Sequence, residues 1–233
     1  MADRVYIIPL WLRVWHWTNA ALMILLIASG FSLHFSDPDL PLIPFEIART
    51  IHNVSGIALT VLYIAYLAWN TVSGNWRQYV PPAKELVSGL NAQNAYVAVG
   101  IFKGAPPPTV PTPERKFNVL QQATYLLVMY VAMPFLIVTG IAFFFPEWAP
   151  EQLFGMDGLL PLAVAHYVIG FLLTLFLLGH IYMGTMGTTP LAGFRMMITG
   201  WHDEHHPGPA GHAPGQTAES STPPADDGDR AQH

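Results

Sequence analysis

Four long stretches of the chain contain no Asp, Glu, Lys or Arg and consist mainly of Leu, Ile, Val, Ala, Phe, Tyr and Met. They cover residues 14–36, 50–76, 117–146 and 158–194. A helix needs about 20 apolar residues to cross the hydrocarbon core of a bilayer, and each stretch is long enough to do so. The pattern predicts an all-α integral membrane protein with four transmembrane helices, near residues 14–36, 50–74, 117–146 and 160–186, that form a four-helix bundle.

The segments outside these spans differ in composition. Residues 77–116 form a loop with an amphipathic piece over Pro82–Phe102, which we expect in the membrane interface, and a Pro-rich linker over Ala105–Pro113. After Trp201 large apolar residues almost disappear, which predicts a disordered acidic tail over residues 202–233 behind a membrane domain of residues 1–201. The first apolar stretch is too long for the apolar region of a signal peptide, so we expect it to be a retained span.

Charge and cysteine content narrow the function classes. Only 11% of residues are charged, the formal net charge is −5, and no basic run is present, so we expect no nucleic-acid partner. The chain has no Cys, which excludes iron–sulfur clusters, thiolate zinc sites, disulfides and covalently attached c-type haem within it. Any metal must therefore be held by His, Met or oxygen ligands.

The distribution of cations predicts the orientation, because positively charged loops stay in the cytoplasm. Arg49 is the single cation on one side of the four predicted spans. The other side carries Arg4, Arg13, Arg77, Lys84, Lys103, Arg115, Lys116, Arg195 and Arg230. Both termini and the loop over residues 77–116 are therefore expected to be cytoplasmic.

Histidines supply the candidate chemistry, because ionisable residues at membrane depth are functional by default. With the amino terminus inside, His16 and His180 share the inner layer, and His52 and His166 share the outer layer. His166 and His180 are 14 residues apart, close to four helical turns, so both leave one face of the fourth span. Two imidazoles per layer suit a flat cofactor with two axial ligands, which is haem b, whereas zinc would require three or four ligands. His34 shares the face of His16 and is the alternative outer ligand, although depth and periodicity favour His52.

Other polar residues near the spans allow two interpretations each. Asn118 and Gln121 begin the third span on the cytoplasmic side, where an amide either caps the helix or binds a ligand. Arg13 and Lys116 lie near the same layer, either as ordinary positive-inside residues or as partners of haem propionates. A different class of function is a haem-free membrane anchor or transporter whose histidines bind protons or metal.

Several motifs, in order along residues 5–207, resemble a known family. They are Arg13-Val-Trp-His16-Trp, Ile51-His52, Lys116-Phe-Asn118-Val-Leu-Gln121, His166 with His180-Ile-Tyr-Met, and Phe194-Arg-Met-Met-Ile-Thr-Gly-Trp. Together they are similar to the membrane-bound cytochrome b subunit, or gamma subunit, of respiratory formate dehydrogenases. Related cytochrome b subunits serve hydrogenases and thiosulfate or polysulfide reductases.

The resemblance implies a bacterial inner-membrane protein with two b haems, one bound by the inner histidine pair and one by the outer pair. Electrons would arrive from an external iron–sulfur subunit, itself fed by a molybdopterin, tungstopterin or nickel–iron catalytic subunit. They would reduce menaquinone or ubiquinone near the cytoplasmic face, where the two amides of the third span would help to bind it. In the reductases electrons flow outward from quinol. The chain alone is not expected to act on the primary substrate.

Overall fold

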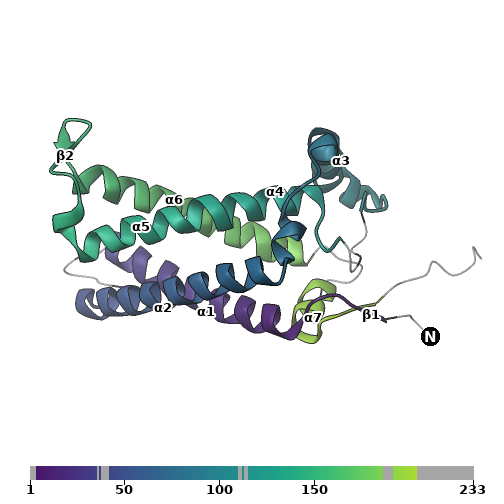
Figure 1. Ribbon diagram of the computed structural model, residues 1–233, viewed down its shortest axis with the longest axis horizontal. Helices are drawn as coiled ribbons and strands as arrows, with labels where there is room; N and C mark the ends of the chain where they lie inside the picture. Colours follow the sequence, from purple (N-terminus) through teal and green to yellow (C-terminus); the bar gives the residue numbers. More distant parts are fainter. Residues whose placement is uncertain are drawn as a thin grey trace, which may run out of the picture.

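Four long helices, which lie side by side in alternating directions, dominate the fold of the chain (Figure 1). The computed structural model describes residues 4–35, 37, 42–109, 112, 115–185 and 191–203. Helices α1 (Leu10–His34), α2 (Phe45–Val72) and α6 (Leu159–Gly184) are continuous. The third is built from α4 (Val119–Leu127), the π-helical turn η5 (Val128–Ala132) and α5 (Met133–Phe144). All four are long and apolar enough to cross a membrane, so the predicted four-span helical architecture is confirmed.

Two of the helices begin earlier than the charge-free stretches indicated. Helix α1 starts at Leu10 and includes Arg13, and α2 starts at Phe45 and includes an ion pair between Glu46 and Arg49, with 2.7 Å between Oε2 and Nη2. A helix continues past the hydrocarbon core without penalty once its side chains reach the headgroups and water. Charge-free runs therefore mark the part of a helix inside the bilayer and not its ends.

The bundle has two distinct ends. We call the end that carries Leu10, Val72, Val119 and Gly184 the proximal end, and the opposite one the distal end. At the distal end the described connections are short: the turn η6 (Pro146–Trp148) and a hairpin of β2 (Gln152–Leu153) with β3 (Met156–Asp157).

Residues 75–103, which include most of the predicted loop over residues 77–116, fold as a chain of short helices at the proximal end (Figure 1). These are η1 (Asn75–Tyr79), η2 (Ala83–Glu85), α3 (Leu86–Ala95), η3 (Tyr96–Gly100) and η4 (Ile101–Lys103). Helix α3 packs against the start of α4, so closely that a Cβ on Gly89 would lie 2.8 Å from Cγ2 of Val119. The loop thus braces the first turn of the third span. Its position relative to the membrane interface stays a prediction.

The two ends of the described chain meet beside α1. Strand β1 (Arg4–Tyr6) pairs antiparallel with β4 (Trp201–Asp203), and α7 (Ala192–Thr199) precedes β4. Gly200 connects them with φ of +86°, a backbone angle that favours glycine, and its carbonyl oxygen accepts hydrogen bonds from the amides of Ile7 and Ile8. We call this arrangement the terminal clasp. It extends the folded chain to Asp203, and residues 204–233 of the predicted tail lie outside the described residues.

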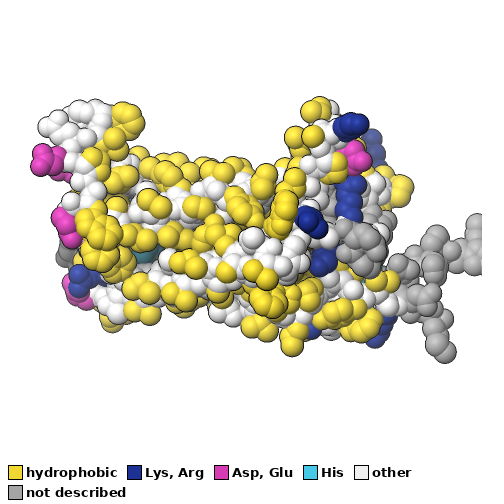
Figure 2. All heavy atoms as spheres, in the orientation of Figure 1, with side chains coloured by type: hydrophobic (Ala, Val, Ile, Leu, Met, Phe, Trp, Pro, Cys, Tyr) yellow, Lys and Arg dark blue, Asp and Glu magenta, His cyan; other side chains and the backbone are white. Residues whose placement is uncertain are grey.

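The outside of the bundle is apolar, and its interior holds small polar residues among the buried apolar ones. Large apolar side chains cover its flanks (Figure 2), whereas small polar residues, Ser29, Asn70 and Thr139, are at most 2% exposed. Hydrocarbon around the helices removes the cost of exposing Leu, Ile, Val and Phe, and the buried polar groups must find partners inside. The arrangement is that expected for helices surrounded by lipid.

Candidate functional site

Four histidines face one another in two pairs between the helices. His16 on α1 and His180 on α6 form the proximal pair, with ring centroids 6.1 Å apart. His52 on α2 and His166 on α6 form the distal pair, with centroids 6.4 Å apart. All four side chains are half-buried. Helix α6 therefore supplies one imidazole to each pair, and the opposite imidazoles come from different helices.

The separation within each pair fits a metal between two imidazoles. A metal–imidazole bond is about 2.0–2.1 Å long, and the ring centre lies about 1.1 Å beyond the nitrogen. Two rings on opposite sides of one metal thus have centroids about 6.2 Å apart, close to both observed distances. Within the described part of the chain no group of three His, Cys, Asp or Glu residues could hold a metal ion. A site with two protein ligands is the chemistry that these residues offer.

A hydroxyl group lies beside each imidazole of the distal pair. Oγ of Ser29 is 3.1 Å from Nδ1 of His52, and Oγ1 of Thr139 is 2.7 Å from Nδ1 of His166. Each hydroxyl donates its own hydrogen to a backbone carbonyl one turn earlier in its helix, to Leu25 at 2.6 Å and to Phe135 at 2.8 Å. Because a hydroxyl has one hydrogen, its oxygen accepts from Nδ1–H of the histidine. This fixes the tautomer in which Nε2 carries the free lone pair and is ready to bind a metal.

Glycines next to these hydroxyls leave room for the distal imidazoles. A Cβ on Gly30 would lie 3.1 Å from Cε1 of His52, and a Cβ on Gly140 would lie 3.6 Å from Cε1 of His166. The two distal histidines therefore have equivalent surroundings, formed by Ser29–Gly30 on α1 for His52 and by Thr139–Gly140 on α5 for His166. A hydroxyl orients each ring, and the following glycine gives it space.

The proximal pair lacks this support. Nδ1 of His16 is buried and has no hydrogen-bond partner among the described residues. His180 makes only ring contacts in this part of the chain, with Phe176 at 5.7 Å and Tyr125 at 6.3 Å between centroids. The two pairs thus share their spacing but differ in what surrounds them.

His34 does not face another histidine. It lies at the distal end of α1, is exposed, and stacks on Tyr167 with 3.8 Å between ring centroids. The structure therefore brings His52, and not His34, opposite His166.

Asn118 and Gln121 form a capping box at the start of α4. The Asn118 side chain accepts from the Gln121 amide at 2.8 Å, and the Gln121 side chain accepts from the Asn118 amide at 3.0 Å. The helix-capping interpretation of these residues is therefore realised in the structure. The cap uses only the two side-chain oxygens, so neither side-chain NH₂ group takes part in it.

The two predicted propionate partners have different surroundings. A guanidinium nitrogen of Arg13 donates to the carbonyl oxygen of Ile198 in the terminal clasp, while its Nε is buried without a partner in the described chain. Lys116 is half-buried, and its partial removal from water lowers the pKa of its ammonium group. Both cations would gain from a nearby anion.

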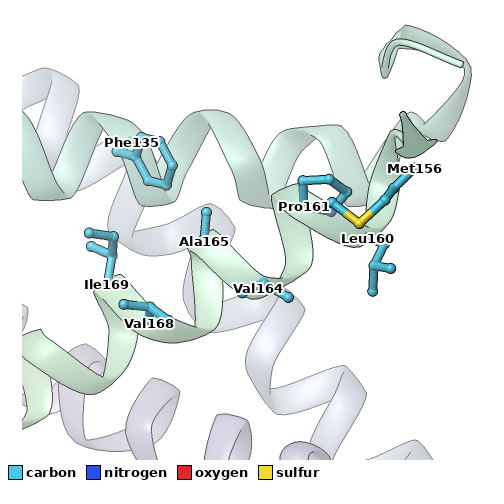
Figure 3. A pocket seen from close by; sticks show the side chains of 8 residues that line it. All are labelled: Phe135, Met156, Leu160, Pro161, Val164, Ala165, Val168 and Ile169. Carbon is cyan, nitrogen blue, oxygen red and sulfur yellow. The ribbon is translucent and has the colours of Figure 1, made fainter. Parts of the chain in front are cut away.

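A groove on the distal half of the bundle offers no such chemistry. It has a volume of about 470 Å³ between α5 and α6 and is lined by apolar residues only, among them Phe135, Leu160 and Val168 (Figure 3). Without a polar group to orient a ligand, we assign it to contact with lipid chains.

Comparison with known proteins identifies the family of the chain. Residues 7–200 match the family described as prokaryotic cytochrome b561. The chain belongs to this family. A protein of Escherichia coli (strain K12) named "Putative cytochrome YdhU" is 30% identical over 200 residues, which cover 86% of this chain and 75% of that protein. The chain is therefore a multi-pass bacterial membrane cytochrome b that takes part in electron transport, and haem b is the cofactor of its family.

The resemblance to membrane cytochrome b subunits is thus confirmed at the level of the family. Ser29 and Thr139 are the residues of this cytochrome that the sequence did not reveal. Ser and Thr commonly bond the preceding turn of their own helix, as Thr60 and Thr174 do here, so nothing along the chain distinguishes the two that also meet a histidine. Their position immediately before Gly30 and Gly140 is the one local signal they share.

Proposed function

We propose that this cytochrome binds two haems b, through the proximal pair His16 and His180 and the distal pair His52 and His166, and conducts electrons between the two membrane faces. The observation that supports this most directly is the spacing of both imidazole pairs, 6.1 and 6.4 Å, at opposite depths of one bundle. Haem b, when bound, supplies a one-electron iron couple, and two histidine ligands leave no coordination position for substrate. The proposed role is electron transfer and not chemistry at iron.

The space around the histidines fits a porphyrin. Gly170 lies one turn after His166 on the same face of α6, and apart from the adjacent backbone of its own helix no described atom lies within 4 Å of the position where its Cβ would be. Gly30 and Gly140 have no side chain of their own, so α1 and α5 can approach the distal imidazoles closely at these two positions. At the proximal end, Arg13 and Lys116 are half-buried cations suited to propionate groups.

The proximal end also has the features of a quinone site. The NH₂ groups of Asn118 and Gln121 are hydrogen-bond donors that the capping box leaves unused, and a quinone carbonyl requires such donors. The described Lys and Arg side chains gather at this end (Figure 2), which favours a cytoplasmic location. Water on that side would supply the protons that quinone reduction consumes.

The absence of Cys means that the chain depends on other subunits for its electrons. We propose an iron–sulfur subunit and a pterin-dependent catalytic subunit on the outer face of the bacterial inner membrane, with formate dehydrogenase as the assignment that the motifs favour. Hydrogenase, thiosulfate reductase and polysulfide reductase complexes are the alternatives, the last two with electrons flowing from quinol to the outside.

A haem count on ligand variants tests the proposal. The detergent-purified chain should contain two haems b by pyridine haemochrome assay, and replacing any of His16, His52, His166 or His180 by Ala should remove one of them. His34→Ala is the matched control and should keep both. A well-folded chain that shows no Soret band after expression with sufficient haem would refute the proposal and favour a haem-free anchor or transporter.

A further inference from the structure

We infer that the hydroxyl groups of Ser29 and Thr139 are positioning residues that lower the reduction potential of the distal haem. The inference rests on the proposed function, because it requires haem at the distal pair. It goes beyond that function by distinguishing the two haems and by naming the residues that separate them.

Each distal ligand belongs to a chain of hydrogen bonds. The hydroxyl donates to a backbone carbonyl and accepts from Nδ1–H of the histidine, so the three groups form a continuous chain from imidazole to helix backbone. Linked hydrogen bonds polarise one another, and the effect is larger where water is excluded. Ser29 is fully buried and Thr139 is 2% exposed, so both bonds are protected from competing water.

An acceptor on Nδ1–H makes the opposite nitrogen of the ring a stronger electron donor. A stronger donor stabilises ferric iron relative to ferrous iron, and hydrogen bonding around the ligands is one of the means by which a protein adjusts a haem potential. Both distal ligands carry such an acceptor. Their effects act in the same direction, toward a lower potential.

The proximal pair lacks the corresponding acceptors. Nδ1 of His16 is buried without a partner, and the imidazole of His180 has ring contacts but no hydrogen bond within the described residues. The ligand surroundings thus make the distal haem the better reductant of the two. They favour electron flow from the distal to the proximal end, which is the direction needed to reduce quinone at the proximal end.

Redox titration of the holoprotein tests the inference. The His16→Ala and His52→Ala variants first assign each midpoint potential and each low-spin ferric EPR signal to one haem. We then expect Ser29→Ala and Thr139→Val each to raise the distal potential and alter the distal EPR signal, with the proximal haem unchanged. In the double variant the electron-sharing equilibrium between the haems should shift by about tenfold, which corresponds to about 59 mV for a one-electron couple.

Matched controls separate this effect from a general loss of packing. Thr174→Val removes a hydroxyl that bonds only the carbonyl of Gly170, and Ser32→Ala removes one that bonds only the backbone of Ile43. Neither should move the distal potential, and Thr139→Ser, which keeps the acceptor, should retain the original value.

Two results would overturn the inference while leaving the proposed function intact. One is a pair of unchanged potentials in Ser29→Ala and Thr139→Val proteins that hold two haems. The other is an equal loss of the distal haem from Thr139→Val and Thr139→Ser, which would assign the effect to packing. Loss from Thr139→Val alone would support the positioning role. A wild-type chain without haem would overturn the proposed function and this inference together.

Discussion

At the scale of single residues, Asn118 and Gln121 can cap a helix and bind quinone at the same time, because the two roles use different side-chain atoms. Their side-chain oxygens accept backbone hydrogens at the start of α4, and their NH₂ groups remain free to donate. A residue that caps a helix is held in one rotamer by the cap, so its remaining donors point in a defined direction. Structural capping would therefore prepare the site for quinone instead of excluding it.

The acidic analogues separate the two roles. Asn118→Asp and Gln121→Glu keep an acceptor oxygen in the capping box but lose the NH₂ donors, so stability should change by only a few tenths of a kcal/mol, and haem reduction by a quinol analogue should slow by roughly three- to tenfold. Asn118→Ala loses both functions and should also cost about 1 kcal/mol. Thermal melts and stopped-flow reduction measure the two effects.

The control for added charge is Asn91→Asp, at an exposed residue of α3. Full reduction rates in both Asn118→Asp and Gln121→Glu would limit these residues to capping.

At the scale of elements, the third span lacks one hydrogen bond within its own helix, and a residue of α2 supplies a donor in its place. The amide of Met133 bonds the carbonyl of Val128 in the π-helical turn η5, and continuing this spacing would pair residue 134 with the carbonyl of Met129. Pro134 has no N–H to give. The hydroxyl of Tyr63 on α2 donates to that Met129 carbonyl at 2.7 Å instead. A backbone irregularity inside the membrane is thus satisfied by a neighbouring helix.

Removing that hydroxyl should destabilise the bundle. In Tyr63→Phe the buried Met129 carbonyl loses its partner at a cost of about 1–3 kcal/mol, which corresponds to a fall in Tm of roughly 2–12 °C for a chain of this size. The matched control is Tyr182→Phe, because Tyr182 is 50% exposed on α6. Equal melting curves for Tyr63→Phe and the wild type would show that Met129 is satisfied in another way.

The depth of each histidine could be predicted from the sequence, whereas contacts between segments that are far apart in the sequence could not. Alternating helix direction predicted that His16 and His180 would share one depth and His52 and His166 another, because depth depends only on position along each span. The terminal clasp was not predictable, since pairing of Arg4–Tyr6 with Trp201–Asp203 joins segments that are far apart in the sequence. The contacts of Ser29 and Thr139 with histidines were not predictable either, because they depend on how α1 and α5 are rotated about their axes relative to the neighbouring helices.

At the scale of the whole molecule, the two ends differ in both charge and chemistry. The distal end has one described cation, Arg49, and its histidines have hydroxyl partners. The proximal end has most of the described cations, the amides of Asn118 and Gln121, and the terminal clasp. If the proximal end is cytoplasmic, electrons that pass from the distal to the proximal end cross the membrane. Each elementary charge moved against 100 mV stores about 2.3 kcal/mol. Energy conservation thus requires this orientation together with electron flow from the outer face, and orientation is the property to establish first.

The lack of Cys in the chain makes that measurement direct, because a single introduced Cys is the only site for a maleimide. Gln152 and Ser88 are both exposed, the first in the distal hairpin and the second on α3 at the proximal end. The positive-inside rule predicts, from the excess of Lys and Arg, that the proximal end is cytoplasmic. A membrane-impermeant maleimide should therefore label Gln152→Cys in intact spheroplasts and label Ser88→Cys only after lysis. The reverse pattern would place the amides of the third span outside the cell, and quinone reduction there would take up protons from the wrong side to conserve energy.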